Sequence, residues 1–278
     1  LPTQYRSVPS IGSLFSHFTY DGILKNHRKE SSQRQLKLDG LKIKDINIVK
    51  FPVSPFESIY RAKKLNQSSN YQIFSAIFTY EFAKYITAQI NKNHSELYRI
   101  GIICPYKAQA SLVDKLFTSS PFDTANVEIQ VGTIHGFQGD ECDIVISLFN
   151  PPPYISESHD MFLNKQNILN VSISRARDYL FILMPDDKTE NITNLQKIQQ
   201  IIHLINLKAK DRSTQFHTDD IEQVMFKKKN YIKENSFSTT HQSVNVYSEA
   251  EWLYEIRCEE TAIDIQVSTQ KAKITTIL

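Results

Sequence analysis

The sequence predicts an α/β protein built on a parallel β-sheet that helices cover on both faces. Between residues 99 and 184, short apolar segments alternate with segments of helical periodicity, which is the pattern of consecutive β–α–β units. The apolar segments are nearly continuous runs, as expected for strands buried on both faces. Because β–α–β connections are right-handed, these strands should pair in parallel with helices on either side of the sheet.

Several elements are expected ahead of this alternation. Turn and cap residues followed by an aromatic cluster predict a short helix over residues 9–18. Residues 25–40 are polar and are predicted to form a loop, and the apolar pattern of residues 41–51 predicts a strand. Aromatic and aliphatic side chains at three- and four-residue spacings predict an amphipathic helix over residues 71–91.

The alternating segments between residues 99 and 184 predict the remaining strands and helices of the sheet domain. Apolar runs predict its strands, and the segments of helical periodicity between them predict its helices. The predicted strands are residues 99–104, 127–134, 143–149 and 179–184, and the predicted helices are residues 107–117 and 161–177. Three consecutive prolines at 151–153 predict an extended loop.

The chain changes character after Pro185, and a domain boundary is predicted between residues 187 and 188. Beyond it, residues 188–278 are predicted to form a small C-terminal accessory extension of the α+β class. Residues 190–208 have the pattern of a helix, and residues 244–267 have that of two or three strands. The segments 209–220 and 234–242 are polar. A small β-rich core is favoured here over a base-stacking surface of aromatic side chains, namely Tyr247, Trp252 and Tyr254.

Composition places the chain among ordinary globular proteins. Hydrophobic residues make up 41% of the 278 residues and charged residues 22%, and no apolar run approaches the roughly 18 residues that span a bilayer. The three cysteines, Cys104, Cys142 and Cys258, are far apart and lack metal-ligand spacing. We therefore expect no metal site, small buried cysteines, and a reducing cytoplasmic location.

The net charge of +2 does not by itself argue for nucleic acid as a partner. Its distribution is uneven, since residues 25–50 hold eight lysines and arginines against three acidic residues. A solvated surface is the favoured interpretation of this segment. The alternative is a basic strip that tracks phosphates.

The most informative segment runs from residue 131 to residue 146. Thr133 and His135 can hydrogen-bond phosphate oxygens, and glycines at 136 and 139 allow the backbone to approach a bulky ligand. Glu141 can accept hydrogen bonds from a ribose hydroxyl. Because the loop follows a predicted parallel strand, it is expected to lie at the carboxyl edge of the sheet, where α/β proteins bind ligands. The alternative is a glycine-rich turn with capping polar residues.

Two further segments carry chemistry. Arg175 and Arg177 follow an apolar run, and a guanidinium can grip phosphate oxygens and neutralise charge during phosphoryl transfer. The alternative is that they cap a helix or pair with Asp178. Near the start of the chain, Tyr5 can stack on a base while Arg6 reaches its phosphates. A surface tyrosine–arginine pair without function is the alternative here.

Together these segments resemble the motifs of one family, the second RecA-like domain of superfamily 1 helicases. The similarity is to the 1B group, which includes the nonsense-mediated-decay and Okazaki-fragment-processing helicases. Its motif IV, L-x-x-Q-Y-R-M-H-P, resembles residues 1–9, with Ser-Val in place of Met-His. A T-P-Y-x-x-Q element resembles residues 104–109, with cysteine for threonine. Motif V, V-D-x-F-Q-G-x-E-x-D-x-I, resembles residues 132–144, and motif VI, N-V-A-L-T-R-A-R/K, resembles residues 170–177.

The resemblance implies a fold, a function and roles for individual residues. Residues 1–187 would form a RecA-like three-layer domain of the P-loop NTPase superfamily, working as part of an ATP-dependent helicase or translocase. Two arginines would act on the phosphates, Arg6 as a γ-phosphate contact and Arg175 as the arginine finger. The other nucleotide-binding residues would be Tyr5 on the adenine, with Gln138, Gly139 and Glu141 nearby. The single-stranded nucleic acid would run along Pro105, Tyr106, Gln109, Thr133 and His135.

Parts of the motor are missing from the sequence. It contains no G-x-x-x-x-G-K-[ST], the motif that cradles the β- and γ-phosphates and positions Mg²⁺. The resemblance implies that an upstream RecA-like domain of the same protein supplies this motif, so ATP and Mg²⁺ are expected to need both domains. The chain alone is expected to be inactive. Its expected partners are single-stranded DNA or RNA and the upstream domain, with no membrane.

Three functions remain open from sequence. The first is the helicase or translocase, and the second is a non-catalytic nucleic-acid-binding or scaffold domain that retains the RecA-like fold. Intact motif V and VI residues argue against the scaffold. The third is a nucleotide-binding regulator. The Thr133/His135 pairing resembles the 1A helicases, so the subgroup and the direction of movement stay open, as does the choice between DNA and RNA.

Overall fold

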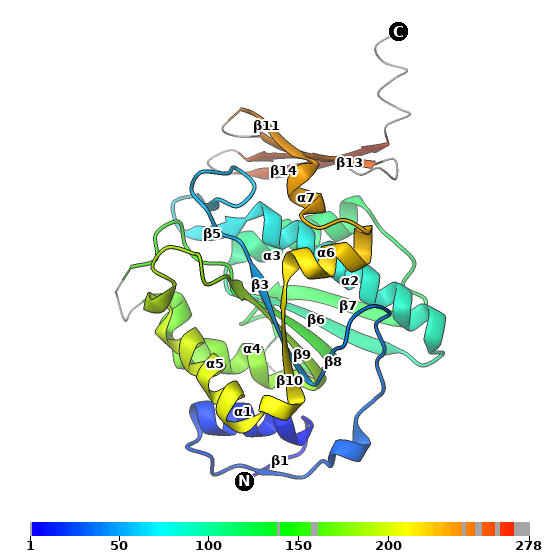
Figure 1. Cartoon of the computed structure of the whole chain (residues 1–278), viewed down its shortest axis with the longest axis vertical. Coiled ribbons are helices and arrows are strands. Elements are labelled where there is room, and N and C mark those ends of the chain that lie inside the picture. Colours follow the sequence, from blue (N-terminus) through cyan, green and yellow to red (C-terminus); the bar gives the residue numbers. More distant parts are fainter. Residues whose placement is uncertain are drawn as a thin grey trace.

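The computed structural model places helices on both faces of a central sheet, with a smaller sheet against one of these helical layers (Figure 1). It describes residues 2–137, 140–156, 161–240, 243–247, 252–258 and 262–269.

Six strands form the central sheet in the order β10-β3-β9-β8-β6-β7. All neighbouring pairs in it are parallel, which confirms the predicted fold class. The strands are β3 (Ile46–Phe51), β6 (Tyr98–Cys104), β7 (Val127–Thr133), β8 (Cys142–Leu148), β9 (Ala176–Pro185) and β10 (Ser213–His217). Because the strands are parallel, their carboxyl ends share one edge of the sheet and their amino ends share the other.

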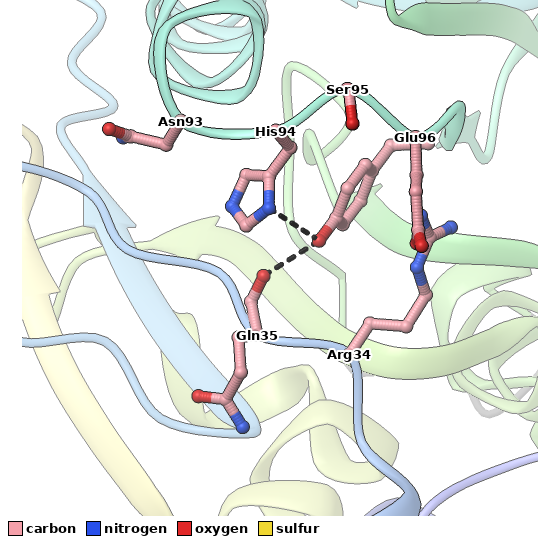
Figure 2. Close-up of a pocket in the computed structure, with 7 residues that line it drawn as sticks. Arg34, Gln35, Asn93, His94, Ser95 and Glu96 are labelled. Atoms are coloured by element: carbon pink, nitrogen blue, oxygen red, sulfur yellow. Dashed lines mark hydrogen bonds and ion pairs between the residues drawn. The ribbon is translucent and has the colours of Figure 1, made fainter.

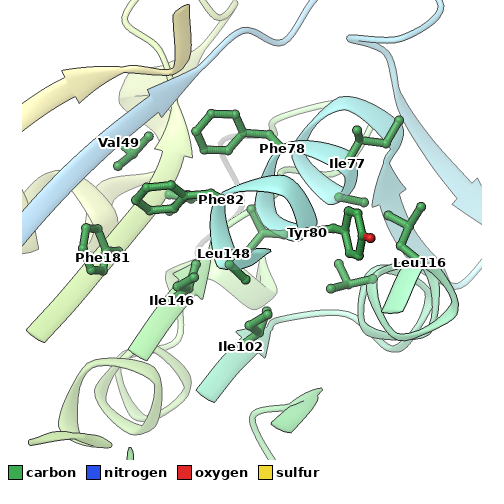
Figure 3. Close-up of a cluster of buried hydrophobic side chains, with 14 of the residues drawn as sticks. Val49, Ile77, Phe78, Tyr80, Phe82, Ile102, Leu116, Ile146, Leu148 and Phe181 are labelled. Carbon is green, nitrogen blue, oxygen red and sulfur yellow. The ribbon is translucent and has the colours of Figure 1, made fainter. Parts of the chain in front are cut away.

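Two apolar clusters hold the helices on the sheet. One face carries α1 (Pro9–Thr19), α4 (Gln166–Ser174) and α5 (Gln196–Lys208). The other carries α2 (Ile73–Asn93), α3 (Lys107–Ser119), α6 (Thr218–Phe226) and the short α7 (Tyr231–Glu234). Figure 3 shows Phe82 of α2 beside Phe181 of β9, and the centroids of these two rings lie 5.2 Å apart. The sheet and the helices packed on its two faces therefore form three layers.

The structure corrects several predicted elements. The predicted helix 161–177 ends at Ser174, because β9 already begins at Ala176 and pairs with β8 there. The polar segment 209–220 contains the edge strand β10 and the start of α6. Strand β10 has the polar sequence STQFH, so its pairing with β3 comes from tertiary structure rather than from its own pattern. A hairpin of β4 (Ala62–Leu65) and β5 (Ser69–Gln72) was not predicted.

A second sheet follows in the C-terminal part. Its four antiparallel strands are β11 (Ser236–Thr240), β12 (Ser243–Tyr247), β13 (Trp252–Cys258) and β14 (Ile263–Thr269). Ile256, Ile263 and Ile265 are buried in the same cluster as α2 and α3, so this sheet packs on that helical layer. The boundary at 187/188 stays a prediction, and the central sheet continues past it through β10. The side chains of Tyr247, Trp252 and Tyr254 lie outside the described residues.

No helix in the described ranges combines the length and the apolar character needed to cross a bilayer.

Candidate functional site

The predicted site residues divide between the two edges of the central sheet. Pro105 and Tyr106 follow β6, and Thr133 ends β7, so these residues lie at the carboxyl edge. Glu141 precedes β8 and Arg175 precedes β9, so both lie at the amino edge. The loop 132–141 therefore has its two ends at opposite edges, and the expectation of a ligand loop at the carboxyl edge applies to its Thr133 end alone.

A buried glutamine shapes the turn that carries Tyr5 and Arg6. The Gln4 amide nitrogen donates to Ser7 O at 2.9 Å and to Asn26 Oδ1 at 2.7 Å. Its carbonyl oxygen accepts hydrogen bonds from the backbone nitrogens of Arg6, at 3.1 Å, and Ser7, at 2.9 Å. With all of these bonds made at a buried side chain, the turn is held in one conformation. Gln4 therefore positions the two residues that sequence assigned to the nucleotide.

Arg6 reaches the segments that lead into β8 and β9. Its Nε lies 2.9 Å from Glu141 Oε1, and one terminal nitrogen donates to Ser174 O at 2.9 Å. The Arg6 and Glu141 side chains are 29% and 40% exposed. A partly solvated ion pair contributes about 1 kcal/mol or less, so an incoming anion can displace the carboxylate at low cost.

Arg175 lies at the end of α4, where it occupies the C-cap position. Its Nε is buried and has no hydrogen-bond partner in the described part of the chain. Burial lowers the pKa of Arg175, and the charge of the nearby Arg6 lowers it further. Two neighbouring guanidiniums, one with a free donor, form a cationic site suited to an oxyanion.

The alternative pairing of Asp178 with Arg175 or Arg177 is wrong. Asp178 Oδ1 lies 2.7 Å from a terminal nitrogen of Arg28, and this pair is buried. Arg177 is exposed at the start of β9.

Tyr5 presents an open aromatic surface beside these charges. Its side chain is 59% exposed, and its ring packs at a tilt against His27 with the centroids 4.6 Å apart. An exposed ring supported by a neighbouring ring can stack on a planar ligand.

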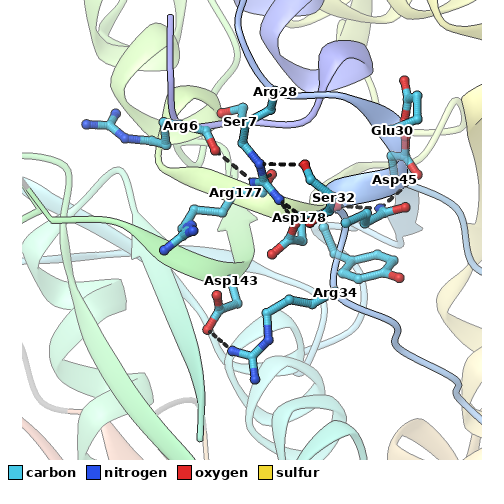
Figure 4. A network of polar contacts seen from close by, with 12 residues as sticks. Arg6, Ser7, Arg28, Glu30, Ser32, Arg34, Asp45, Asp143, Arg177 and Asp178 are labelled. Carbon is cyan, nitrogen blue, oxygen red and sulfur yellow. Dashed lines mark hydrogen bonds and ion pairs between the residues drawn. The ribbon is translucent and has the colours of Figure 1, made fainter. Parts of the chain in front are cut away.

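Residues 25–44 lie along the amino edge of the sheet, and we call them the amino-edge strap. Its arginines bind carboxylates at the starts of strands (Figure 4). Arg28 contacts Asp178 of β9, and Arg34 contacts Asp143 of β8 at 3.0 Å. Arg28 and Arg34 are thus occupied within the chain, and the hypothesis of a phosphate-tracking strip fails for these two residues.

Arg34 also borders a cavity of about 300 Å³ next to the strap. Its guanidinium carbon lies 3.7 Å from the Tyr98 ring centroid, a cation–π contact. The Tyr98 hydroxyl donates to Gln35 O at 2.7 Å and lies 3.4 Å from His94 Nδ1 (Figure 2). These contacts fasten the strap to β6 and to the end of α2.

At the carboxyl edge, the ends of β6 and β7 lie side by side, with Cys104 paired to Thr133. Tyr106 is half-buried against the Phe162 ring at 5.5 Å, and burial raises its pKa to about 12. Thr133 is half-buried and His135 is exposed. Thr133 and His135 therefore place polar side chains at this edge, next to the partly exposed side chain of Tyr106.

Gln109 and Pro105 do not share this exposure. Gln109 is fully buried, its Oε1 accepts a hydrogen bond from Gln72 N at 2.7 Å, and its Nε2 donates to Ser75 Oγ at 3.2 Å. In this conformation Gln109 joins α3 to the start of α2 and has no free group for a strand. Pro105 is also buried.

Phe137 fastens the loop between the two edges to the face of the sheet. Its ring is fully buried over two strand glycines, Gly101 of β6 and Gly132 of β7. A Cβ on either glycine would lie 3.0 Å from a ring carbon of Phe137. This close approach requires glycine at both positions, because a larger side chain would displace the Phe137 ring. Gln138 and Gly139, predicted near the nucleotide, lie outside the described residues.

Cys104 and Cys142 are buried free thiols, and burial raises the pKa of Cys142 to about 12. Within the described ranges, no three or more histidine, cysteine or acidic side chains are grouped to hold a metal ion.

A six-stranded parallel sheet with helices on both faces is consistent with a RecA-like domain. Comparison with known families agrees, because a family described as an AAA domain matches residues 1–187. The chain belongs to this family, the C-terminal RecA-like part of superfamily 1 helicases.

Individual relatives carry helicase names. The DNA polymerase alpha-associated DNA helicase A of Saccharomyces cerevisiae is 28% identical over 66% of this chain and 27% of its own length. Helicase SEN1 of the same yeast is 27% identical over 66% of this chain and 8% of its own. The probable RNA helicase armi of Drosophila melanogaster is 28% identical over 64% and 15%. The chain thus spans 27% or less of the length of these relatives.

Proposed function

We propose that this chain is the half of an ATP-driven helicase or translocase that supplies the arginine finger and part of the nucleic-acid track. The observation that carries the proposal is the pair Arg6 and Arg175 at the amino edge, where the buried Nε of Arg175 has no partner in the described part. An unpartnered buried donor beside a second cation is costly unless an anion binds there.

The nucleotide would bind at the amino edge. Tyr5 stacks on the adenine, and Arg6 exchanges Glu141 for the γ-phosphate. Glu141 then faces the sugar or phosphate, with Gln138 and Gly139 beside it. Arg175 neutralises the charge that develops on the phosphoryl group during transfer, which is the role of an arginine finger.

The residues of this chain fit a triphosphate but do not complete its site. Two guanidiniums match phosphate oxygens, whereas the sequence has no loop that wraps the β- and γ-phosphates. The upstream RecA-like domain would supply that loop and hold Mg²⁺. ATP would therefore bind between the two domains.

The single strand would cross the carboxyl edge. The exposed His135 and the half-buried Tyr106 and Thr133 contact its backbone or bases. Pro105 and Gln109 act indirectly, because both are buried and shape the turn that carries Tyr106. The strand is DNA or RNA, and the names of the relatives include both a DNA and an RNA helicase.

The loop 134–141 would couple the two edges. It begins after Thr133, at the proposed track, and reaches Glu141, at the proposed nucleotide site, while Phe137 packs on the sheet between them. When phosphate displaces Glu141 from Arg6, the freed end of the loop can move relative to the sheet. Movement at the Glu141 end would change the position of the Thr133 end. Nucleotide binding and single-strand binding would then affect each other's affinity.

An ATPase assay tests the proposal. The full-length protein should hydrolyse ATP faster in the presence of single-stranded DNA or RNA, whereas residues 1–278 alone should show no hydrolysis. Running both nucleic acids in parallel identifies the preferred strand. A full-length protein that binds the strand without any hydrolysis would instead support a scaffold.

A further inference from the structure

A cavity of about 240 Å³ opens at the carboxyl edge, away from the residues discussed so far. Three segments line it, and each follows a different strand of the sheet: residues 53–62 after β3, residues 152–155 after β8, and residues 189–191 after β9. Its walls are mainly apolar and include Val53, Pro55, Pro152, Pro153 and Tyr154.

Two aromatic rings project into solvent around this cavity. Tyr154 lines it and is 88% exposed, and Phe56, next to the lining residue Pro55, is 91% exposed. They are the two most exposed large hydrophobic side chains in the described part of the chain. Exposing a large ring to water beside a mainly apolar cavity is unfavourable, so the position of Tyr154 favours a binding role for this surface.

The prolines present Tyr154 at little entropic cost. Residues 151–153 are all proline, which restricts the backbone that leads to the tyrosine. On the opposite wall, the Arg61 Nε and one terminal nitrogen donate to Pro55 O at 3.0 and 2.6 Å, which closes the segment 55–61 on itself. A cavity with two such constrained walls is largely formed before a ligand arrives, and pre-organisation favours affinity.

We propose that this cavity is a nucleobase-binding subsite, in which an unpaired base of the single strand stacks on Tyr154. The inference rests on the proposed function, because it extends the proposed track along the same edge. The hairpin of β4 and β5 links the cavity to the proposed track. Ala62 of β4 lines the cavity, and Ser69 Oγ of β5 accepts a hydrogen bond at 2.8 Å from Ala108 N, two residues after Tyr106.

Stacking rather than charge would hold the base. Arg61 and Glu190 both line the cavity, so their opposite charges offset one another. Stacking on an aromatic ring tolerates every base, which suits a motor that must move along any sequence. The subsite therefore adds affinity without adding sequence preference or salt dependence.

The test uses the full-length protein and single strands that carry one fluorescent 2-aminopurine, moved along the strand position by position. In the wild type, one position should be quenched by stacking on Tyr154. Tyr154→Ala should lose this quenching and bind long strands about 10-fold more weakly. The dependence of its affinity on salt concentration should be the same as in the wild type. Tyr154→Phe keeps the ring and should retain both properties. Leu207→Ala, which truncates an exposed side chain of α5, is the matched control and should behave as the wild type.

The outcomes separate this inference from the proposed function. If the wild type binds no single strand, the proposed function fails together with the subsite. If the wild type binds strands and Tyr154→Ala binds them equally well with the same quenching, the subsite is refuted while the track stands. Since the Tyr154 side chain is exposed, the variant should fold normally, and an unchanged melting temperature confirms it.

Discussion

Replacing Arg175 with alanine in the full-length protein is expected to lower strand-stimulated ATP hydrolysis by about 10³-fold, the smaller of the effects typical of arginine fingers. The substitution removes a guanidinium that has a buried, unpartnered Nε at the proposed phosphate site. Nucleotide affinity should change little, because the finger acts mainly on charge that develops during transfer. Steady-state hydrolysis and fluorescent-nucleotide titration measure the two effects separately.

Lys92→Ala is the control for this experiment. Lys92 is an exposed lysine in the last turn of α2 that pairs with Asp39 at 3.0 Å, and it is not among the proposed nucleotide contacts. Its replacement should leave hydrolysis unchanged. Wild-type turnover in Arg175→Ala would exclude the arginine-finger role.

Replacing Arg28 with alanine is expected to lower the free energy of unfolding by about 3 kcal/mol or more. The Asp178 side chain is only 1% exposed and burial raises its pKa, with Arg28 opposing the rise. Without Arg28 the carboxylate would remain buried without its charge partner. Arg28 also donates to the backbone oxygens of Arg6, at 2.8 Å, and Arg177, at 3.1 Å, so the amino edge should loosen as well. Denaturant unfolding measures the loss.

Arg99→Ala serves as the stability control, since breaking the exposed pair of Arg99 with Glu128, at 3.2 Å, should cost about 1 kcal/mol or less. Adding Asp178→Asn to Arg28→Ala should restore part of the stability, because it removes the stranded charge. Equal losses for Arg28→Ala and Arg99→Ala would show that the amino-edge strap is not held by this buried pair.

The fold class could be predicted because burial on both faces leaves a strong mark on a sequence. The apolar runs of β6, β8 and β9 and the aromatic spacing of α2 each matched their observed positions closely. Strand β10 was not predicted, because an edge strand needs few apolar residues. Its backbone pairing with β3 leaves no periodic pattern in the sequence.

The sequence identified residues that lie together in the candidate site, but it did not show at which edge of the sheet each of them lies. The motifs selected Arg6, Glu141 and Arg175, and the structure brings these three together. Nothing local in sequence indicates that the loop 134–141 changes edges, because that depends on Phe137 docking over two glycines of separate strands. The burial of Gln109 was not predicted either, because it depends on hydrogen bonds to Gln72 and Ser75, which lie far away in the chain.

The strap shows how composition can mislead. Its excess of positive charge looked like a solvated surface or a phosphate track, yet Arg28 and Arg34 bind aspartates at the starts of β9 and β8. The aspartates lie more than 100 residues further along the chain, so only the fold reveals the pairs.

The central claim is that the loop 134–141 links a nucleotide site at the amino edge to a single-strand site at the carboxyl edge. It is tested most directly by measuring the single-strand affinity of the full-length protein with and without a non-hydrolysable ATP analogue, in the wild type and in Glu141→Gln. The wild-type affinity should change about 5-fold or more with the analogue, and Glu141→Gln should bind both ligands with a much smaller change. A wild-type protein that binds both ligands with no effect of one on the other would contradict the account.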